Sequence, residues 1–239
     1  MVKTKKNHWK VTVITTMPEI FPGPLNYSNV GKALDSGLWS LELIQIEKHK
    51  NGKKIKIDGP PAGGGPGMVM RADAVIPIIK KIKESGDNRP IIVPAARGMK
   101  YNQKYARKLI KEEGIIIICS RFEGIDQRII DITGAIEMAI GDFILTNGDI
   151  AAINIIDSSV RLLDGVLNKK ESTYIESYEN DLLEHPHYTL PREYEGYQIP
   201  EILLSGDHEK INSFRKNQSI QTTENNRPDL IKKYRKNKD

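Results

Sequence analysis

Short runs rich in β-branched residues alternate along the first two-thirds of the chain with segments whose apolar residues recur at helical spacing. The runs that predict strands are Val11–Thr15, Leu41–Ile46, Ile91–Val93, Ile115–Cys119 and Ile136–Ile140. The segments that predict helices are Ala72–Glu84, Gln103–Glu113, Ile125–Ile132 and a helix beginning at Asp149, with Ile150, Ile153 and Ile156 on its apolar stripe. Because Ile115–Cys119 is apolar on both faces, the pattern predicts an α/β domain with a mainly parallel sheet covered by helices.

The alternation stops after Leu167, and the chain then becomes polar and acidic. Beyond Pro200 the helical pattern returns. Ser205 is expected to cap a helix there, and Pro228 is expected in the first turn of a last helix. The sequence thus predicts a first domain at 1–167, an acidic interdomain linker at 168–184 and a small helical domain at 185–239.

Charge separates the tail from the rest of the chain. The 239 residues carry a net charge of +5, and the segment 209–239 alone holds nine basic and four acidic residues. A basic tail on a neutral body predicts either a polyanion-binding appendage or a solvated helical surface, and charge alone leaves both open. The single cysteine, Cys119, excludes an internal disulfide, and no apolar run approaches the ~20 residues that span a bilayer. We therefore expect a soluble, cytoplasmic protein without a membrane partner.

The glycine run Gly63–Gly67 does not match the common nucleotide-binding loops. A P-loop would continue with Lys and Ser or Thr, which are missing here. A Rossmann fingerprint would follow an apolar strand, whereas Lys53–Ile57 is highly charged and Pro60 and Pro61 intervene. The run is thus either a loop whose exposed backbone closes over a ligand or an ordinary exposed turn.

Three loops of small and polar residues follow predicted strands: Pro94–Gly98, Ser120–Gly124, and the segment from Ile140 to Asp149. Ligands of open α/β sheets bind outside the carboxyl ends of the strands. Each loop alone could be an ordinary turn between a strand and a helix. The three together predict a ligand site formed by backbone N–H and C=O groups.

These loops also contain motifs that occur together in a known family. The motifs are Gly63–Met68, Arg121–Arg128, Ile140–Leu145, Ile156–Ser158 with Arg161, Gly165–Leu167, Pro186–Thr189 and Leu203–His208. In this order, and spread from about Val11 to Leu230, they resemble the bacterial tRNA (guanine-N1)-methyltransferase family, the TrmD family. Each motif alone is weak, but the ordered set is highly specific.

The resemblance implies a SPOUT-class parallel sheet with a deep trefoil knot, and a homodimer with its active site at the interface. It implies that S-adenosylmethionine donates a methyl group to N1 of the guanosine immediately 3′ of a tRNA anticodon, with Mg²⁺ required but no ligands identifiable. The cofactor-binding residues that it implies are Pro94, Ser120, Glu123, Gly124, Ile140, Gly141, Asp142, Phe143, Ile144, Leu145, Asn147 and Gly148. Ser120 and Asn147 stand where the family usually has glycine, and Ala62 replaces a common aromatic residue.

Methylation at N1 of guanine requires a general base, because that nitrogen carries a proton, and a cation near O6, where negative charge develops. By resemblance the cation is Arg161, which could otherwise be an exposed helical arginine paired with Asp157. The base position falls at Glu176, where the family usually has aspartate, and Asp181 is the reserve candidate.

The RNA-binding residues that the resemblance implies are Ser205, His208, Lys210, Arg215 and Lys216. Two alternatives stay open: a non-catalytic RNA-binding protein of the SPOUT fold, and a SPOUT methyltransferase that acts on another RNA.

Overall fold

The computed structural model describes residues 8–47, 49–50, 53–54, 56–167 and 176–237. The chain forms two compact units, Met1–Asn168 and Lys169–Asp239. The first half of the predicted linker, residues 168–175 with Glu171, lies outside the described residues.

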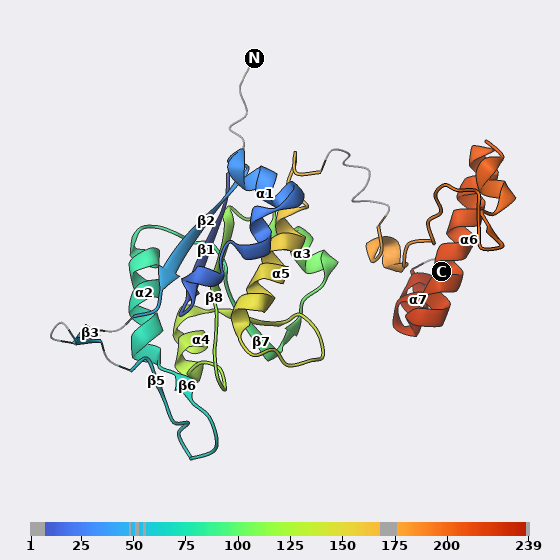
Figure 1. Cartoon of the computed structure of the whole chain (residues 1–239). Coiled ribbons are helices and arrows are strands. Elements are labelled where there is room, and N and C mark those ends of the chain that lie inside the picture. Colours follow the sequence, from blue (N-terminus) through green and yellow to red (C-terminus); the bar gives the residue numbers. More distant parts are fainter. Residues whose placement is uncertain (1–7, 48, 51–52, 55, 168–175, 238–239) are drawn as a thin grey trace. The chain divides into compact units, whose positions relative to one another are not determined.

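Unit 1 is built on a five-stranded sheet in which every neighbouring pair is parallel, as the sequence predicts. The strand order is β2-β1-β8-β7-β9 (Figure 1). The strands are β1 (Trp9–Thr15), β2 (Trp39–Gln45), β7 (Ile91–Lys100), β8 (Gly114–Ile118) and β9 (Ile136–Ala139). Every residue of the central strand β8 is buried, which explains its uniformly apolar sequence.

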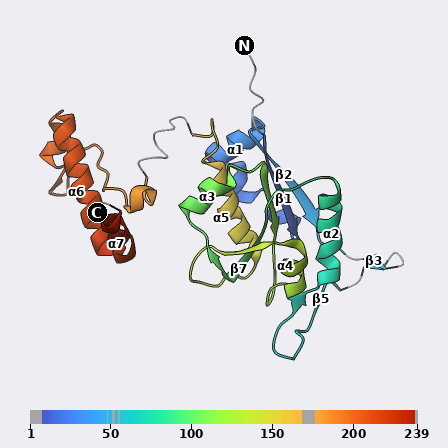
Figure 2. The ribbon, with the colours of Figure 1, turned by 180° about the vertical axis from the view of Figure 1, so that it is seen from behind.

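Helices cover both faces of this sheet (Figures 1 and 2). On one face lie α1 (Ser28–Asp35), α3 (Gln103–Leu109) and α5 (Gly148–Val160), and on the other lie α2 (Ala72–Glu84) and α4 (Gln127–Thr133). Alternate residues of β8 point to opposite faces, so Ile115 and Ile117 join one hydrophobic core and Ile116 and Ile118 join the other. The two cores thus sandwich the sheet.

The shorter described elements of unit 1 also contribute to the two cores, Leu25 to one and Met70 to the other. These elements are 3-10 helices at Pro18–Ile20 and Gly23–Asn26 and two small antiparallel ribbons, one of β3 (His49–Lys50) and β4 (Lys53–Lys54), the other of β5 (Asp58–Gly59) and β6 (Val69–Met70).

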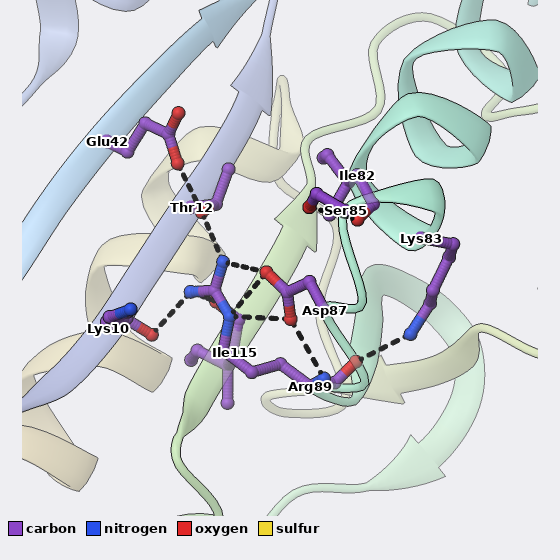
Figure 3. A network of polar contacts seen from close by, with 9 residues as sticks. All are labelled: Lys10, Thr12, Glu42, Ile82, Lys83, Ser85, Asp87, Arg89 and Ile115. Atoms are coloured by element: carbon purple, nitrogen blue, oxygen red, sulfur yellow. Dashed lines mark hydrogen bonds and ion pairs between the residues drawn. The ribbon is translucent and has the colours of Figure 1, made fainter.

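A buried arginine joins the strands at their amino ends (Figure 3). The side chain of Arg89 is 7% exposed and donates to the backbone oxygens of Lys10 and Ile115, the Thr12 hydroxyl and the Asp87 carboxylate. The Arg89 guanidinium lowers the pKa of the Asp87 carboxyl. Thr12 in turn donates to Glu42 of β2, 2.9 Å away. The charge of Arg89 is therefore paired and its guanidinium ties β1 to β8.

Unit 2 holds the long helix α6 (His208–Asn226) and α7 (Pro228–Lys236), a short hairpin of β10 (Glu193–Tyr194) and β11 (Tyr197–Gln198), and 3-10 helices at Glu179–Asp181 and Glu201–Leu204. Pro228 opens α7 as predicted. The prediction that Ser205 caps the long helix α6 is wrong. Asp207 caps α6 by accepting from the Lys210 backbone N–H at 3.1 Å, whereas Ser205 ends the preceding 3-10 helix.

Other differences from the predicted elements reflect tertiary contacts. β7 continues from Val93 to Lys100 because β9 pairs with its far end, and α3 stops at Leu109 rather than Glu113. The prediction that Ile150 lies on the buried face of α5 is wrong, because Ile150 is exposed. Ala151, Ala152 and Ile155 are buried on this helix. No helix within the described ranges is long and apolar enough to cross a membrane.

Candidate active site

A pocket of about 360 Å³ lies where β7, β8 and β9 end, at the carboxyl edge of the sheet. Its walls come from the middle of β7 (residues 93–97), the end of β9, the loop that follows β8, and the segment from Ile140 to the first turn of α5. This volume is within the range of small-molecule sites. The pocket therefore occupies the place that the three loops predict.

One wall is an excursion of β7. Met138 of β9 pairs with both Pro94 and Met99, so the four residues between them leave the ladder, and three of them, Ala95, Ala96 and Arg97, line the pocket. Gly98 allows this path, because a Cβ there would lie 2.4 Å from the backbone of Glu137 and Met138. Any larger residue must push β7 away from β9.

The second wall, after β8, is joined to the glycine-rich segment. The Glu123 N–H donates to the Met68 oxygen, and the Met70 N–H donates to the Gly124 oxygen, at 3.0 and 2.9 Å. A Cβ on Gly67 would lie 2.4 Å from the Glu123 side chain, and φ there is +80°. The glycine-rich loop is therefore tied at its end to a pocket wall, which favours its interpretation as part of a ligand site over an isolated turn.

Two of the departures from the family pattern, Ser120 and Asn147, hold the pocket loops in place. The Ser120 hydroxyl donates to the Pro94 oxygen at 3.3 Å, and its carbonyl accepts from the Gly148 N–H at 2.8 Å. Asn147 caps α5 by accepting from the Asp149 N–H at 3.0 Å, and its φ of −160° is ordinary extended backbone. Glycine is therefore not required for backbone conformation at position 147.

A buried carboxylate lies behind this wall. The Thr15 hydroxyl, at the end of β1, donates to Asp149 Oδ1 at 2.5 Å, and Asp149 is 0% exposed. Within the described residues, Asp149 Oδ2 and the Thr16 hydroxyl have no hydrogen-bond partner. Burial, with a smaller effect of the Asp149 charge, raises the pKa of the Cys119 thiol, so that the thiol stays protonated at neutral pH.

Eleven of the twelve predicted cofactor-binding residues line this one pocket, and Asp142 does not. Sequence reasoning did not select Glu137 and Arg97, whose side chains form an ion pair of 2.9 Å at the pocket; Arg97 also donates to Gln127 of α4. Both residues could have been identified from the sequence, because Arg97 lies in one of the three predicted loops and Glu137 interrupts an otherwise apolar strand.

Arg161 does not line the pocket. It is the C-cap of α5, whose first residue Gly148 does line it. At 1.5 Å per residue, the two ends of this helix are about 18 Å apart. Partial burial raises the pKa of the Asp157 carboxyl, and the charge of the nearby Arg161 lowers it by a smaller amount, so the two side chains interact electrostatically. Within one chain, this guanidinium is thus remote from the pocket.

Glu176 lies in unit 2, at the edge of a hollow of about 320 Å³ that is also lined by Arg215 and Lys216. The structure therefore brings the predicted base together with two of the predicted RNA-binding residues. Asp181, the reserve candidate, instead forms an ion pair with Lys233 and accepts from the Asn237 amide at 2.9 Å. These contacts give it a role in holding α7.

Of the remaining predicted RNA-binding residues, Ser205 ends the 3-10 helix before α6, and His208 and Lys210 lie in the first turn of α6, where Lys210 pairs with Asp207 at 2.9 Å. No group of three or more His, Cys, Asp or Glu residues suited to a metal ion occurs in the described part of the chain.

The family model described as "tRNA (Guanine-1)-methyltransferase TrmD" matches residues 9–233. The chain is 48% identical over 223 residues to a protein of Mesorhizobium japonicum, which covers 93% of this chain and 96% of the relative. It is 46% identical to a protein of Roseobacter denitrificans (93% and 92%) and 45% identical to one of Agrobacterium fabrum (94% and 97%). All three relatives are named tRNA (guanine-N(1)-)-methyltransferase.

The chain belongs to the TrmD family. The match spans both units, so membership does not rest on the sheet alone. In this TrmD family member, the pocket at the carboxyl edge contains backbone groups and small side chains from all three loops, which suits a ligand held by its hydrogen-bonding edges.

Proposed function

We propose that this protein is a cytoplasmic enzyme that transfers a methyl group from S-adenosylmethionine to N1 of the guanosine immediately 3′ of a tRNA anticodon. One observation carries the proposal: eleven residues that the resemblance assigns to the cofactor lie around a single pocket. Bound S-adenosylmethionine supplies an activated methyl group on a sulfonium, so the protein's main task at this pocket is to position it.

The acceptor needs two further groups. Guanine N1 must lose its proton, and we assign that step to the Glu176 carboxylate acting as general base. Negative charge then develops toward O6, and we assign its stabilisation to the Arg161 guanidinium. The longer side chain of Glu176, compared with the usual aspartate, places the carboxylate one methylene further from the backbone.

We also propose that the active enzyme is a homodimer of the SPOUT class with a deep trefoil knot. The separation between Arg161 and the pocket of the same chain supports this proposal, since a second copy can supply the missing guanidinium. Magnesium dependence is part of the proposal, without assigned ligands.

A methylation assay on defined transcripts tests the reaction. We expect incorporation into an unmodified tRNA with guanosine 3′ of the anticodon, and none into a transcript with adenosine there. Binding of tRNA without methylation would contradict the enzyme assignment and favour the non-catalytic alternative. Equal methylation of both transcripts would favour another target nucleotide.

The base assignment is tested by Glu176→Gln, with Glu179→Gln as the matched control from the same hollow. We expect the Glu176 variant to lose at least about 10²-fold in turnover, the scale of general-base catalysis, while binding S-adenosylmethionine normally. Near-normal turnover would place the base elsewhere.

A further inference from the structure

A dense group of basic residues lies in unit 1, outside the tail that the sequence analysis singled out. Residues 100–111 contain Lys100, Lys104, Arg107, Lys108 and Lys111 and no acidic residue. This segment covers the end of β7, the whole of α3 and the turn that follows.

The lysines of α3 share one face. Lys104 and Lys108 are four residues apart within α3, which places them on one side of the helix, and Lys111 lies in the turn that follows, where its N–H donates to the Lys108 oxygen at 3.2 Å. All three are exposed, whereas Ala106 and Leu109 are buried on the side of α3 that packs toward α5. We call the exposed side, with Lys100, the α3 basic face.

These lysines are not neutralised by neighbouring carboxylates. In the described part of the chain, Lys100, Lys104, Lys108 and Lys111 form no ion pair, and Lys108 instead lies over the Tyr105 ring, 5.4 Å from its centroid. In the tail, by comparison, four of the nine basic residues, Lys210, Arg227, Lys233 and Arg235, are each paired with an aspartate or glutamate. The α3 basic face therefore presents exposed lysines without ion-pair partners, and the carboxylates next in the chain, Glu112 and Glu113, are exposed as well.

This face also begins beside the candidate active site. Lys100 pairs with Ala139 of β9, and the Tyr101 N–H donates to the Ala139 oxygen at 2.8 Å. Ala139 lines the pocket. From that edge, the lysines continue along α3 and into the turn that follows it, where Lys111 lies.

We propose that the α3 basic face binds the phosphate backbone of the RNA substrate, as a second contact surface in addition to unit 2. The inference rests on the proposed function, which requires a large polyanion to approach this pocket. Exposed lysines without carboxylate partners suit phosphate contacts, because each contact releases condensed counterions and fixes the RNA without reading its sequence.

The test compares two triple variants of the full chain. Lys104→Gln/Lys108→Gln/Lys111→Gln removes three charges from the α3 basic face. Lys32→Gln/Lys80→Gln/Lys81→Gln removes three exposed charges from α1 and α2, so the net charge of the two proteins is the same. Glutamine forms helices nearly as well as lysine, and surface changes of this kind leave the fold intact.

Binding of an unmodified tRNA transcript is measured at several salt concentrations, and binding of S-adenosylmethionine is measured in parallel. We expect the α3 variant to bind tRNA about tenfold more weakly or worse at 0.1 M salt, with a salt slope shallower by about 2 to 3. Its affinity for S-adenosylmethionine should equal that of the wild type, and the control variant should stay within about threefold for tRNA.

An α3 variant that matches the control in tRNA affinity and salt slope would overturn the inference while leaving the proposed function intact. Wild-type protein that binds tRNA through this face but does not methylate it would contradict the proposed function alone. Failure of the wild type to bind tRNA would overturn both.

Discussion

The two ends of the five-stranded sheet are made from the same parallel strands but use polar groups in different ways. At the amino ends, the buried Arg89 donates to acceptors on β1 and β8 and is paired with Asp87. At the carboxyl ends, Asp149 Oδ2 and the Thr16 hydroxyl are buried without hydrogen-bond partners among the described residues.

The backbone is also less regular at the carboxyl end of the sheet than at the amino end. The pocket edge depends on an interrupted ladder between β7 and β9 and on the close approach of Gly98 to Glu137. One end of the sheet thus secures the fold, while the other accepts imperfect packing to form a ligand pocket. Substitutions at the two ends should therefore separate stability from binding.

Arg89→Met should give the largest effect, on stability. The substitution leaves the Asp87 carboxylate and the carbonyl oxygens of Lys10 and Ile115 without their donor, and breaking a buried pair in this way costs about 3 kcal/mol of unfolding free energy. Denaturant unfolding measures the loss. The matched control is Arg71→Met, because Arg71 pairs with Asp73 at 2.9 Å on the surface, and its unfolding midpoint should be unchanged.

The Arg89→Met variant also tests whether the amino end of the sheet affects ligand binding, when binding is measured under conditions in which the variant is still folded. Arg89→Met should then bind S-adenosylmethionine with wild-type affinity. A weakened affinity without unfolding would show that the amino end shapes the pocket, and the division between the two ends would be wrong.

Gly98→Ala should give the next largest effect, on activity. The added Cβ must displace β9 or the β7 excursion, and a shift of about 1 Å in a reacting group can cost about 10²-fold in rate. Methylation kinetics measure this loss. Gly59→Ala is the control, since a Cβ at Gly59 meets no atom within 4 Å. Equal methylation rates for both variants would show that the pocket tolerates a larger separation between β7 and β9.

Much of the sheet is predictable because local pattern determines it. The bounds of α2 are those predicted, and the strands differ only at their ends, apart from β7. The location of the pocket also follows from the sequence, since ligand loops of parallel sheets follow the strands.

What could not be predicted depends on which residues meet in space. The pairing of Arg89 with Lys10 and Ile115 requires the strand order, and the extension of β7 to Lys100 requires the register with β9. The charge of the tail is evident in the sequence, but its compensation by ion pairs such as Lys233–Asp181 is visible only in the structure. In the same way, the exposure of Lys104, Lys108 and Lys111 on one surface is visible only in the structure.

Thr15→Val and Thr16→Val form a matched pair at the carboxyl end. Thr15→Val removes the donor to the buried Asp149 carboxylate, and leaving an acceptor unpaired should cost about 1 to 3 kcal/mol of unfolding free energy. Thr16→Val removes a hydroxyl that has no partner within the described residues, so its unfolding free energy should stay the same or rise. Equal destabilisation by both substitutions would contradict the account of this end.

The smallest expected effect is the pH dependence of the amino-end network. The pKa of Asp87 is lowered in the folded protein, chiefly by its hydrogen bonds from Arg89, so ionised Asp87 stabilises the fold above the ordinary aspartate pKa of about 4. That contribution is lost as pH falls below about 4 and through the lowered pKa. Wild type should therefore lose more unfolding free energy between pH 5 and pH 3 than Asp87→Asn does. In the Arg89→Met background, Asp87→Asn should no longer change this pH dependence, because the interaction that lowers the pKa is gone. If the double variant keeps the full difference, the acid sensitivity arises from a carboxylate outside this network.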